Sequence, residues 1–249
     1  MVAGVLQWRP GPVGFGVLHL IAFGFLAASF VVFLAIREVP YPHAPVCRAR
    51  SFLDNLRQMP QLVRADRRFR NYLLADACMS GIFIMIPFLG IHARDVLRQP
   101  ESYLGFLLMV HTVGSISGNL VGGVLGDRFG GKRVIVLSQA TFLVICTWGT
   151  LASRSFEFLS LFFLLGAAQT WLSIGKQTIA LEISPVAQRA SYLAIIGTNQ
   201  IPATLAAWLI SYLAWHSTQS FAWVAILTGV CVATAVALLS RVQEPRRHY

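Results

Sequence analysis

Four polar side chains whose types could do chemistry lie within one apolar segment, residues 157–182. Their spacing of i, i+4, i+7 and i+8 places all of them on one side of an α-helix: Gln169, Ser173, Lys176 and Gln177. Lys176 is one of only two lysines in the chain. If the segment crosses a membrane, such a face lines a water-filled cavity or the interior of a helix bundle. A polar seam that only joins helices is the alternative interpretation.

A carboxylate and a hydroxyl, Asp76 and Ser80, stand one helical turn apart in another apolar segment, residues 71–93. An unpaired carboxylate inside a membrane span costs about 2.5–3.5 kcal/mol, so we expect Asp76 to face protein or water. The second interpretation places it at the depth of the lipid headgroups. Asp76 and Lys176 lie toward the same end of their spans, so they are candidates for an ion pair or for proton coupling.

The sequence carries few signs of other chemistry. Its four cysteines are isolated from one another, and it has neither a phosphate-binding glycine loop with lysine nor a His/Glu metal spacing. An intramembrane serine protease would need Ser117 with His111 or His216, but Ser117 lies among small residues where helix packing explains it. We therefore expect no enzyme, no catalytic residues, no metal and no cofactor, with coupling to protons or another ion left open.

Composition identifies the setting of these residues. Hydrophobic residues make up 56% of the 249 residues and charged residues only 12%, with a mean hydropathy of +0.64. A soluble domain carries about 25% charged residues. The chain thus predicts an all-α integral membrane protein in the lipid bilayer with seven transmembrane helices. The expected spans are residues 13–36, 71–93, 103–126, 134–152, 157–182, 190–213 and 220–240.

The positive charge alternates between the two sides of these spans. Sixteen of the 20 Lys and Arg residues fall in residues 37–70, 127–133, 176–189 and the tail from 241. By the positive-inside rule, this pattern predicts an N-terminus outside the cell membrane and a cytoplasmic C-terminus. The net charge of +10 therefore does not indicate a nucleic-acid partner.

Three parts of the chain follow from the spans. Residues 1–36 hold the first span, and residues 37–70 form a cytoplasmic linker with eight arginines. Apolar residues recur at helical spacing within that linker, which indicates an amphipathic helix on the membrane surface; a disordered linker is the alternative. Residues 71–249 are expected to form a six-helix bundle with a short tail.

A ladder of glycines is the most specific packing signal in the chain. Gly114, Gly118, Gly122 and Gly126 recur every fourth residue. They clear a strip about 18 Å long on one side of a helix, so that another helix backbone can approach closely. A compact charged turn follows the ladder directly and connects it to the next span.

This turn carries a resemblance to a known family. Residues 123–133, GVLGDRFGGKR, resemble the signature loop of the major facilitator superfamily of secondary transporters. The matching positions are Gly123, Gly126, Asp127, Arg128, Gly130, Lys132 and Arg133. The family usually has a basic residue where Gly131 stands. The long basic linker, the Pro87-Phe88 pair two spans before the loop, and a Ser-Pro turn followed by Arg189 occur in the family's order.

The resemblance implies which part of a transporter this chain corresponds to. It corresponds to helices six to twelve of a twelve-helix transporter, so we expect a truncated chain and a missing N-terminal six-helix half as a partner. The family's seventh and tenth helices face the central cavity. The implied candidates for binding an unknown small-molecule substrate are Asp76, Ser80, Gln169, Ser173, Lys176 and Gln177.

The resemblance also implies that the charged turn acts as a conformational latch. If the helix that starts at Pro185 packs beside the glycine ladder, Asp127 would face the positive end of that helix and Arg189. Two alternatives to a transporter stay open: a fragment that transports nothing, or a half-transporter that needs a partner. A seven-span receptor is a remote alternative, because Asp127-Arg128-Phe129 resembles the Asp-Arg-Tyr of rhodopsin-like receptors.

Overall fold

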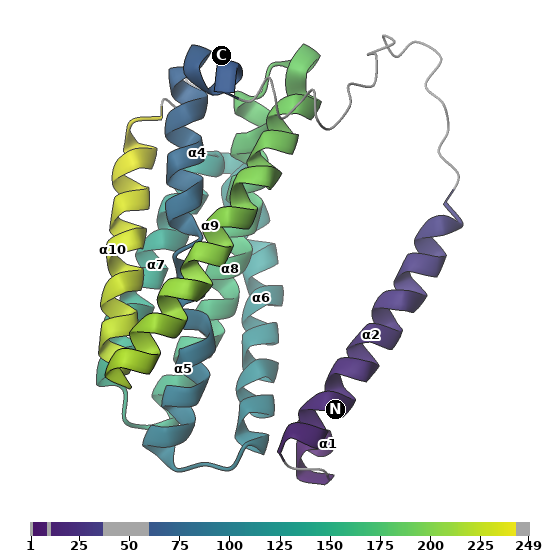
Figure 1. The fold of residues 1–249 in the computed structure, drawn as a ribbon, viewed down its shortest axis with the longest axis vertical. Helices are drawn as coiled ribbons and strands as arrows, with labels where there is room; N and C mark the ends of the chain where they lie inside the picture. The colour runs from purple at the N-terminus through teal and green to yellow at the C-terminus, as the bar shows by residue number, and fades with distance from the viewer. Residues whose placement is uncertain (1, 9–10, 37–59, 243–249) are drawn as a thin grey trace.

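The computed structural model describes residues 2–8, 11–36 and 60–242, and every regular element within them is a helix (Figure 1). The elements are α1 Val2–Trp8, α2 Pro12–Leu34, α4 Arg67–Met79, α5 Ile82–Leu97, α6 Ser102–Phe129, α7 Gly131–Leu151, α8 Ser155–Ile183, the 3₁₀ turn η1 Val186–Gln188, α9 Arg189–Thr218 and α10 Phe221–Ser240.

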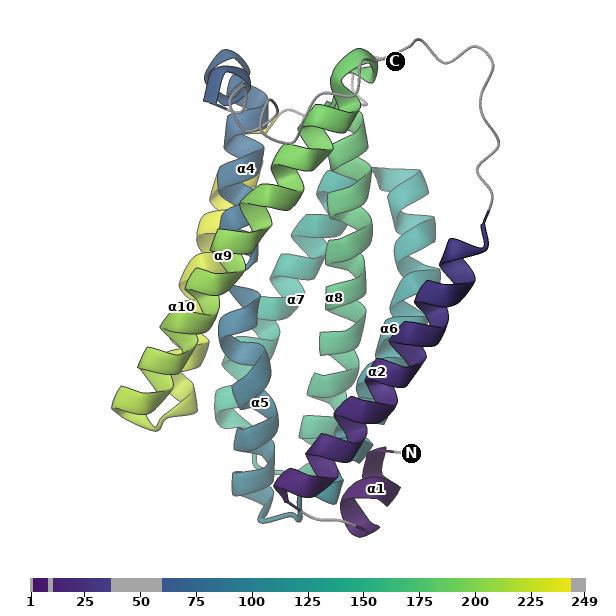
Figure 2. The same cartoon turned by 45° about the vertical axis from the view of Figure 1, so that its right-hand side comes forward.

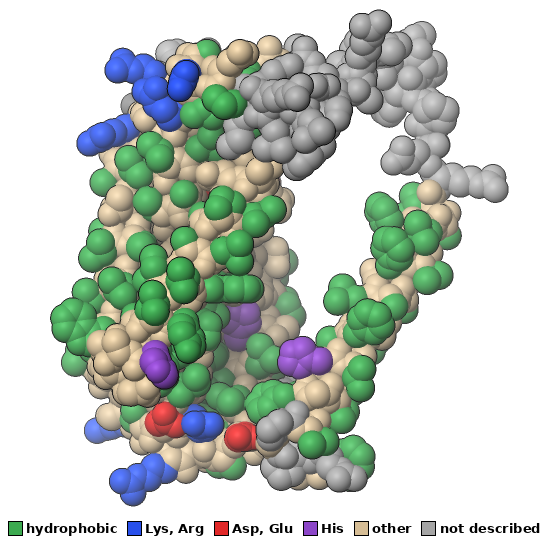
Figure 3. Space-filling model, viewed as in Figure 1, with side chains coloured by type: hydrophobic (Ala, Val, Ile, Leu, Met, Phe, Trp, Pro, Cys, Tyr) green, Lys and Arg blue, Asp and Glu red, His purple; other side chains and the backbone are tan. Residues whose placement is uncertain are grey.

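The prediction of an all-α membrane fold with seven spans is confirmed. Seven stretches in the described residues are long and apolar enough to cross a membrane, with α4 and α5 together forming one of them. On the face shown in Figure 3, hydrophobic side chains cover the middle of the molecule, while the visible Lys and Arg side chains lie at its two ends. This distribution matches a protein whose waist lies in hydrocarbon and whose ends lie in water.

Six of the seven spans pack against one another, and α2 stands apart from them (Figure 1). Its side chains are exposed along nearly the whole helix. Contact with the bundle is made at the end where α2 begins, where α1 packs on α6 and the Gly11 amide donates to a Glu101 carboxylate oxygen at 3.1 Å (Figure 2). An apolar helix can lie apart from the bundle because its backbone hydrogen bonds are made within the helix and its apolar side chains are compatible with lipid.

Most of the predicted linker, residues 37–59, lies outside the described residues, and so does most of its predicted amphipathic helix. Residues 60–65 are helical. Asp66 then caps α4, since its Oδ1 accepts a hydrogen bond from the Phe69 amide at 3.0 Å. The second span therefore begins four residues earlier than the predicted start at residue 71.

The glycine ladder is a close helix contact between α6 and α8. A Cβ added at Gly118 would lie 2.7 Å from the Ala167 Cα, and one added at Gly114 would collide with the Phe163 carbonyl. A Cβ at Gly122 would lie 2.7 Å from the Trp171 ring. Glycine is required at these positions because the neighbouring backbone or ring already occupies the space.

The second span is broken where the sequence predicted one continuous helix. Ser80 and Gly81 separate α4 from α5, and their amides bond to carbonyls three residues back in the 3₁₀ manner. A Cβ at Gly81 would collide with the Cys231 side chain of α10. Close packing of α10 on the break therefore requires glycine there.

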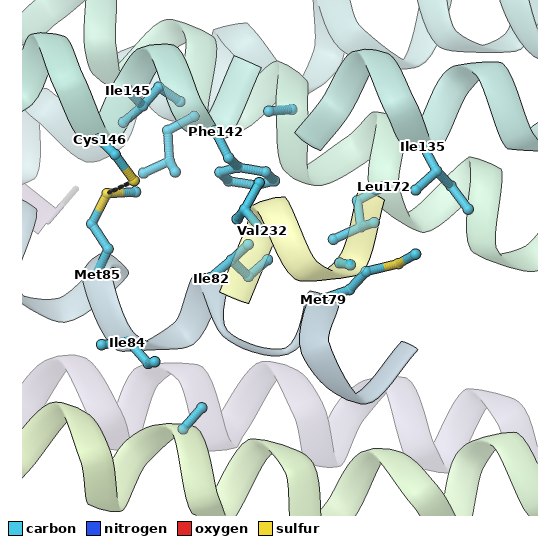
Figure 4. Close-up of a cluster of buried hydrophobic side chains, with 14 of the residues drawn as sticks. Met79, Ile82, Ile84, Met85, Ile135, Phe142, Ile145, Cys146, Leu172 and Val232 are labelled. Atoms are coloured by element: carbon cyan, nitrogen blue, oxygen red, sulfur yellow. Dashed lines mark hydrogen bonds between the residues drawn. The ribbon is translucent and has the colours of Figure 1, made fainter. Parts of the chain in front are cut away.

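Buried apolar side chains hold this break inside the bundle. Figure 4 shows Met79 before the break and Ile82, Ile84 and Met85 after it, beside side chains of α7, α8 and α10. The Cys146 thiol of α7 lies 3.6 Å from the Met85 sulfur. The interior is thus apolar around the break, and polar groups near it must find partners or reach the cavity.

Candidate functional site

A cavity of about 650 Å³ opens between α4, α5, α8 and α9. Its walls are formed by the following residues: Tyr72, Met79, Ser80, Ile82, Phe83, Gln169, Leu172, Ser173, Lys176, Gln177, Ala180, Leu181, Leu193, Ile196, Gly197 and Gln200. Five of the six residues predicted to line a substrate cavity are among them. The sixth, Asp76, is not part of this lining but contacts Lys176, which is.

Asp76 and Lys176 form an ion pair between α4 and α8. The Lys176 Nζ lies 2.5 Å from the Asp76 Oδ1. The Asp76 side chain is fully buried, whereas that of Lys176 is 15% exposed. Tyr72, one turn before Asp76, donates its hydroxyl to the Lys176 carbonyl at 3.3 Å and so holds the same two helices together. Asp76 therefore faces protein, as the first of the two interpretations expects.

The Asp76 carboxylate is incompletely satisfied. Its Oδ2 is buried and has no hydrogen-bond partner among the described residues. A buried carboxylate in a low-dielectric interior depends on its counter-ion, and here that counter-ion is the ammonium of Lys176. Any group that draws this ammonium away leaves Asp76 uncompensated.

Gln169 is held in place by a residue that sequence reasoning did not assign to the site. The His111 Nε2 of α6 lies 2.8 Å from the Gln169 Oε1, so the ring donates and the amide oxygen accepts. The Gln169 side chain lies in the cavity wall, and its Nε2 takes no part in that bond. No periodicity within one helix signals this link, because the two residues lie on different spans.

Ser173 and Gln177 lie one turn apart along the same wall, and the Gln177 amide donates to the Ser173 hydroxyl at 3.4 Å. The opposite wall comes from α9, which contributes Gln200 and Gly197. Gln200 was not among the predicted site residues. The cavity therefore carries three amide side chains and three hydroxyls within mainly apolar walls.

The predicted latch turn lies between α6 and α7. Gly130 has a φ of +84°, a conformation that favours glycine, and its amide bonds to the Gly126 carbonyl at 3.0 Å. Gly123 has open space beside it, and a Cβ at Gly126 would make only an ordinary contact, 3.6 Å from Ile174. The C-terminal end of the glycine ladder is thus less crowded than its N-terminal part.

The basic side chains of the turn have distinct contacts. Lys132 donates to the carbonyls of Val242 and Ser240 at 2.6 and 3.4 Å, so it caps the end of α10. The guanidinium groups of Arg128 and Arg133 both lie over the Phe129 ring, 5.5 and 5.8 Å from its centroid. The turn is therefore joined to the end of the last helix.

Gly131, the position that departs from the family signature, has a packing role. A Cβ at Gly131 would lie 2.8 Å from the Gly175 carbonyl oxygen of α8 and 2.9 Å from the Thr178 Cβ. A basic residue in its place would force α7 away from α8. The departure thus follows from the close approach of these two helices.

The predicted neighbour of the latch differs in the structure. The glycine ladder packs on α8, not on the helix after Pro185. That helix, α9, begins only at Arg189, after the 3₁₀ turn η1. The Arg189 Nε is buried without a hydrogen-bond partner among the described residues. The expectation that Asp127 faces the start of α9 required the glycine ladder to pack against that helix. This packing is not observed.

Metal chemistry finds no support in the part of the chain that the structure describes, where no group of three or more His, Cys, Asp or Glu residues could hold an ion. The residues around the cavity instead offer hydrogen bonds, one ammonium group and apolar surface. These features are typical of a small-molecule pocket.

Comparison with protein families decides the identity of the bundle. The model of the Major Facilitator Superfamily matches residues 71–249, which is more than half of the chain. The chain belongs to the major facilitator superfamily. No curated protein matches it. As a member of this superfamily it is a multi-pass membrane transporter of the MFS kind, and the superfamily is in general one of transporters, not enzymes.

Proposed function

We propose that this MFS chain supplies one half of a secondary transporter that moves a small solute by alternating access. The cavity between α4, α5, α8 and α9 would be the substrate site of this half. The observation that carries the proposal is the Asp76–Lys176 pair, a buried charge pair whose ammonium reaches a cavity between four helices of a membrane bundle.

Alternating access needs two bundles that rock about a site near the middle of the membrane. The six packed spans supply one bundle, and we propose that a second six-helix half closes the open side of the cavity. The alternation of basic residues favours a cytoplasmic position for the turn between α6 and α7, and for the C-terminus.

The Asp76–Lys176 pair also makes the cavity a candidate for ion coupling. A bound solute that competes for the Lys176 ammonium would change the energy of a negative charge on Asp76. A proton or another cation could then restore neutrality. In the same cycle, the turn that holds Asp127, Arg128, Lys132 and Arg133 would bias one conformation over the other.

Transport can be tested with purified chain in proteoliposomes. A panel of sugars, amino acids, nucleosides, organic anions and organic cations is first screened for solutes that raise the unfolding temperature. Each such solute is then followed as a radiolabelled compound in counterflow. Ser173→Trp, which fills the cavity, is expected to abolish flux, and Leu205→Trp on the exposed face of α9 is expected to retain it.

The outcomes separate the alternatives. Solute binding with flux only after addition of a second six-helix half would support a partner-dependent half-transporter. A folded chain that no solute stabilises, and that shows no flux in either setting, would support a fragment that transports nothing. In a setting where the unmodified chain transports, equal flux in Ser173→Trp would remove the cavity from the proposal.

A further inference from the structure

The cavity presents positive charge to a solute. Among the described residues that line it, Lys176 is the charged one. Its counter-ion Asp76 is fully buried and does not reach the cavity, whereas the Lys176 side chain is 15% exposed. A solute in the cavity therefore meets an ammonium group and not the carboxylate behind it.

The break in the second span also borders this cavity. Ser80, Ile82 and Phe83, which line the cavity, stand at the beginning of the 16-residue helix α5. The negative end of α4 meets the positive end of α5 at this break, and the Phe83 and Ile84 amides already donate to the Ser80 and Gly81 carbonyls. The break therefore leaves Lys176 as the group that favours a negative charge in the cavity.

Lys176 has donors left for such a group. An ammonium has three N–H donors, and the contact with Asp76 is made through one oxygen, Oδ1. The walls beside it are apolar over Phe83, Leu172 and Ile196, with amides at Gln169 and Gln200. This combination suits a molecule with one anionic head and an apolar body.

We propose that the cavity binds organic monoanions, with the anionic head on Lys176 in competition with Asp76 and the apolar body against Phe83 and Leu172. This inference rests on the proposed function and names its substrate class. Two negative groups that share one ammonium repel each other, so Asp76 weakens the hold on the bound anion. Asp76 thereby keeps the site able to release its ligand.

The test uses three probes with the same naphthalene body: 2-naphthoate, 2-naphthamide and 2-naphthylmethylammonium. Their binding to the full chain in phosphatidylcholine nanodiscs is measured by calorimetry, with empty nanodiscs as the reference. We expect 2-naphthoate to bind about tenfold more tightly than 2-naphthamide, and the ammonium probe to bind most weakly.

Two variants sharpen the test. Asp76→Asn removes the competing charge and is expected to tighten 2-naphthoate binding by about tenfold, with a change of less than about threefold for 2-naphthamide. The double variant Asp76→Asn with Lys176→Met removes both charges without leaving one unpaired, and should bind the acid and the amide equally. Asp95→Asn, which alters an exposed ion pair with Arg94, is the matched control and should leave all three affinities unchanged.

Preference for the amide or the ammonium probe, or weaker 2-naphthoate binding by Asp76→Asn, would overturn the inference while leaving a solute cavity in place. If none of the probes binds the unmodified chain or Asp76→Asn, the inference is overturned. If the solute panel also finds no ligand, the proposed function loses its support as well. The unfolding temperature of each variant establishes that the folded protein is being compared.

Discussion

The ammonium of Lys176 and the carboxylate of Asp76 meet inside the bundle at 2.5 Å, one from α8 and the other from α4. Their environments differ, since Asp76 is fully buried while Lys176 reaches the cavity. The pair is therefore both a connection between two helices and the charged element of the candidate site.

Loss of the lysine should cost more stability than loss of the carboxylate. Lys176→Met leaves a fully buried, unpaired carboxylate and is expected to destabilise the fold by about 3–5 kcal/mol. Asp76→Asn should cost less, because the ammonium that remains can reach water in the cavity. Unfolding in mixed detergent measures both. Restoration of most of the loss in the Asp76→Asn, Lys176→Met double variant is the control, and equal losses in the two single variants would contradict the argument.

The glycine ladder allows a matched pair of substitutions on one helix. Gly118→Ala places a methyl group against the Ala167 backbone and is expected to destabilise by about 1–3 kcal/mol. Gly123→Ala has open space beside it and should be neutral or slightly stabilising. Thermal unfolding of the two variants side by side tests the α6–α8 contact. A similar loss in both would show that helix packing is not the reason for the ladder.

Gly131 provides a test of the departure from the family signature. Introduction of the family's basic residue, Gly131→Arg, should destabilise the protein by about 1–3 kcal/mol because its Cβ meets the Gly175 carbonyl. Gly126→Ala, at a position with only an ordinary contact, is the control. Fluorescence-detected gel filtration after heating reports both. An unfolding temperature for Gly131→Arg at or above that of the unmodified chain would refute the packing explanation.

Lys132 should stabilise the end of the last helix. Lys132→Met removes the ammonium from the Val242 and Ser240 carbonyls, at an expected cost of about 1 kcal/mol. Amides in the last turn of α10 should then exchange hydrogen about fivefold faster, while amides in the middle of α8 stay unchanged. Lys132→Arg should retain part of the protection. Equal exchange rates for the last turn of α10 in Lys132→Met and in the unmodified chain would show that the Lys132 contact does not stabilise this end of the helix.

Asp127 tests the latch hypothesis in the proposed transport cycle. Asp127→Asn should shift the balance of inward-open and outward-open states by about two- to fivefold, the range expected for one exposed charge near a helix end. A maleimide that reacts with a Ser173→Cys reporter in the assembled transporter measures the accessible fraction. Asp95→Asn serves as the control. Unchanged labelling from the cytoplasmic side in Asp127→Asn would exclude the latch.

Local patterns were sufficient to predict the spans and much of the candidate site. The seven spans depend on length and apolar content, and the face of Gln169, Ser173, Lys176 and Gln177 depends on helical spacing alone. Both properties depend only on the residues of one continuous segment. The family resemblance of residues 123–133 added the superfamily, which the family model confirmed.

Relations between spans could not be read in the same way. The break at Ser80 and Gly81 is packed against Cys231 of α10, and Gln169 is hydrogen-bonded to His111 of α6. The glycine ladder predicted a close contact with another helix but did not identify that helix, which is α8.

By itself, the sequence determined that this is a helical membrane protein with a glycine strip, a signature turn and a polar face, because hydropathy and i, i+4 spacing act within one helix. Only the tertiary structure decided which faces meet. It paired Asp76 with Lys176, placed Gly131 against Gly175 and opened the cavity between α4, α5, α8 and α9, since these depend on packing between segments far apart in the chain.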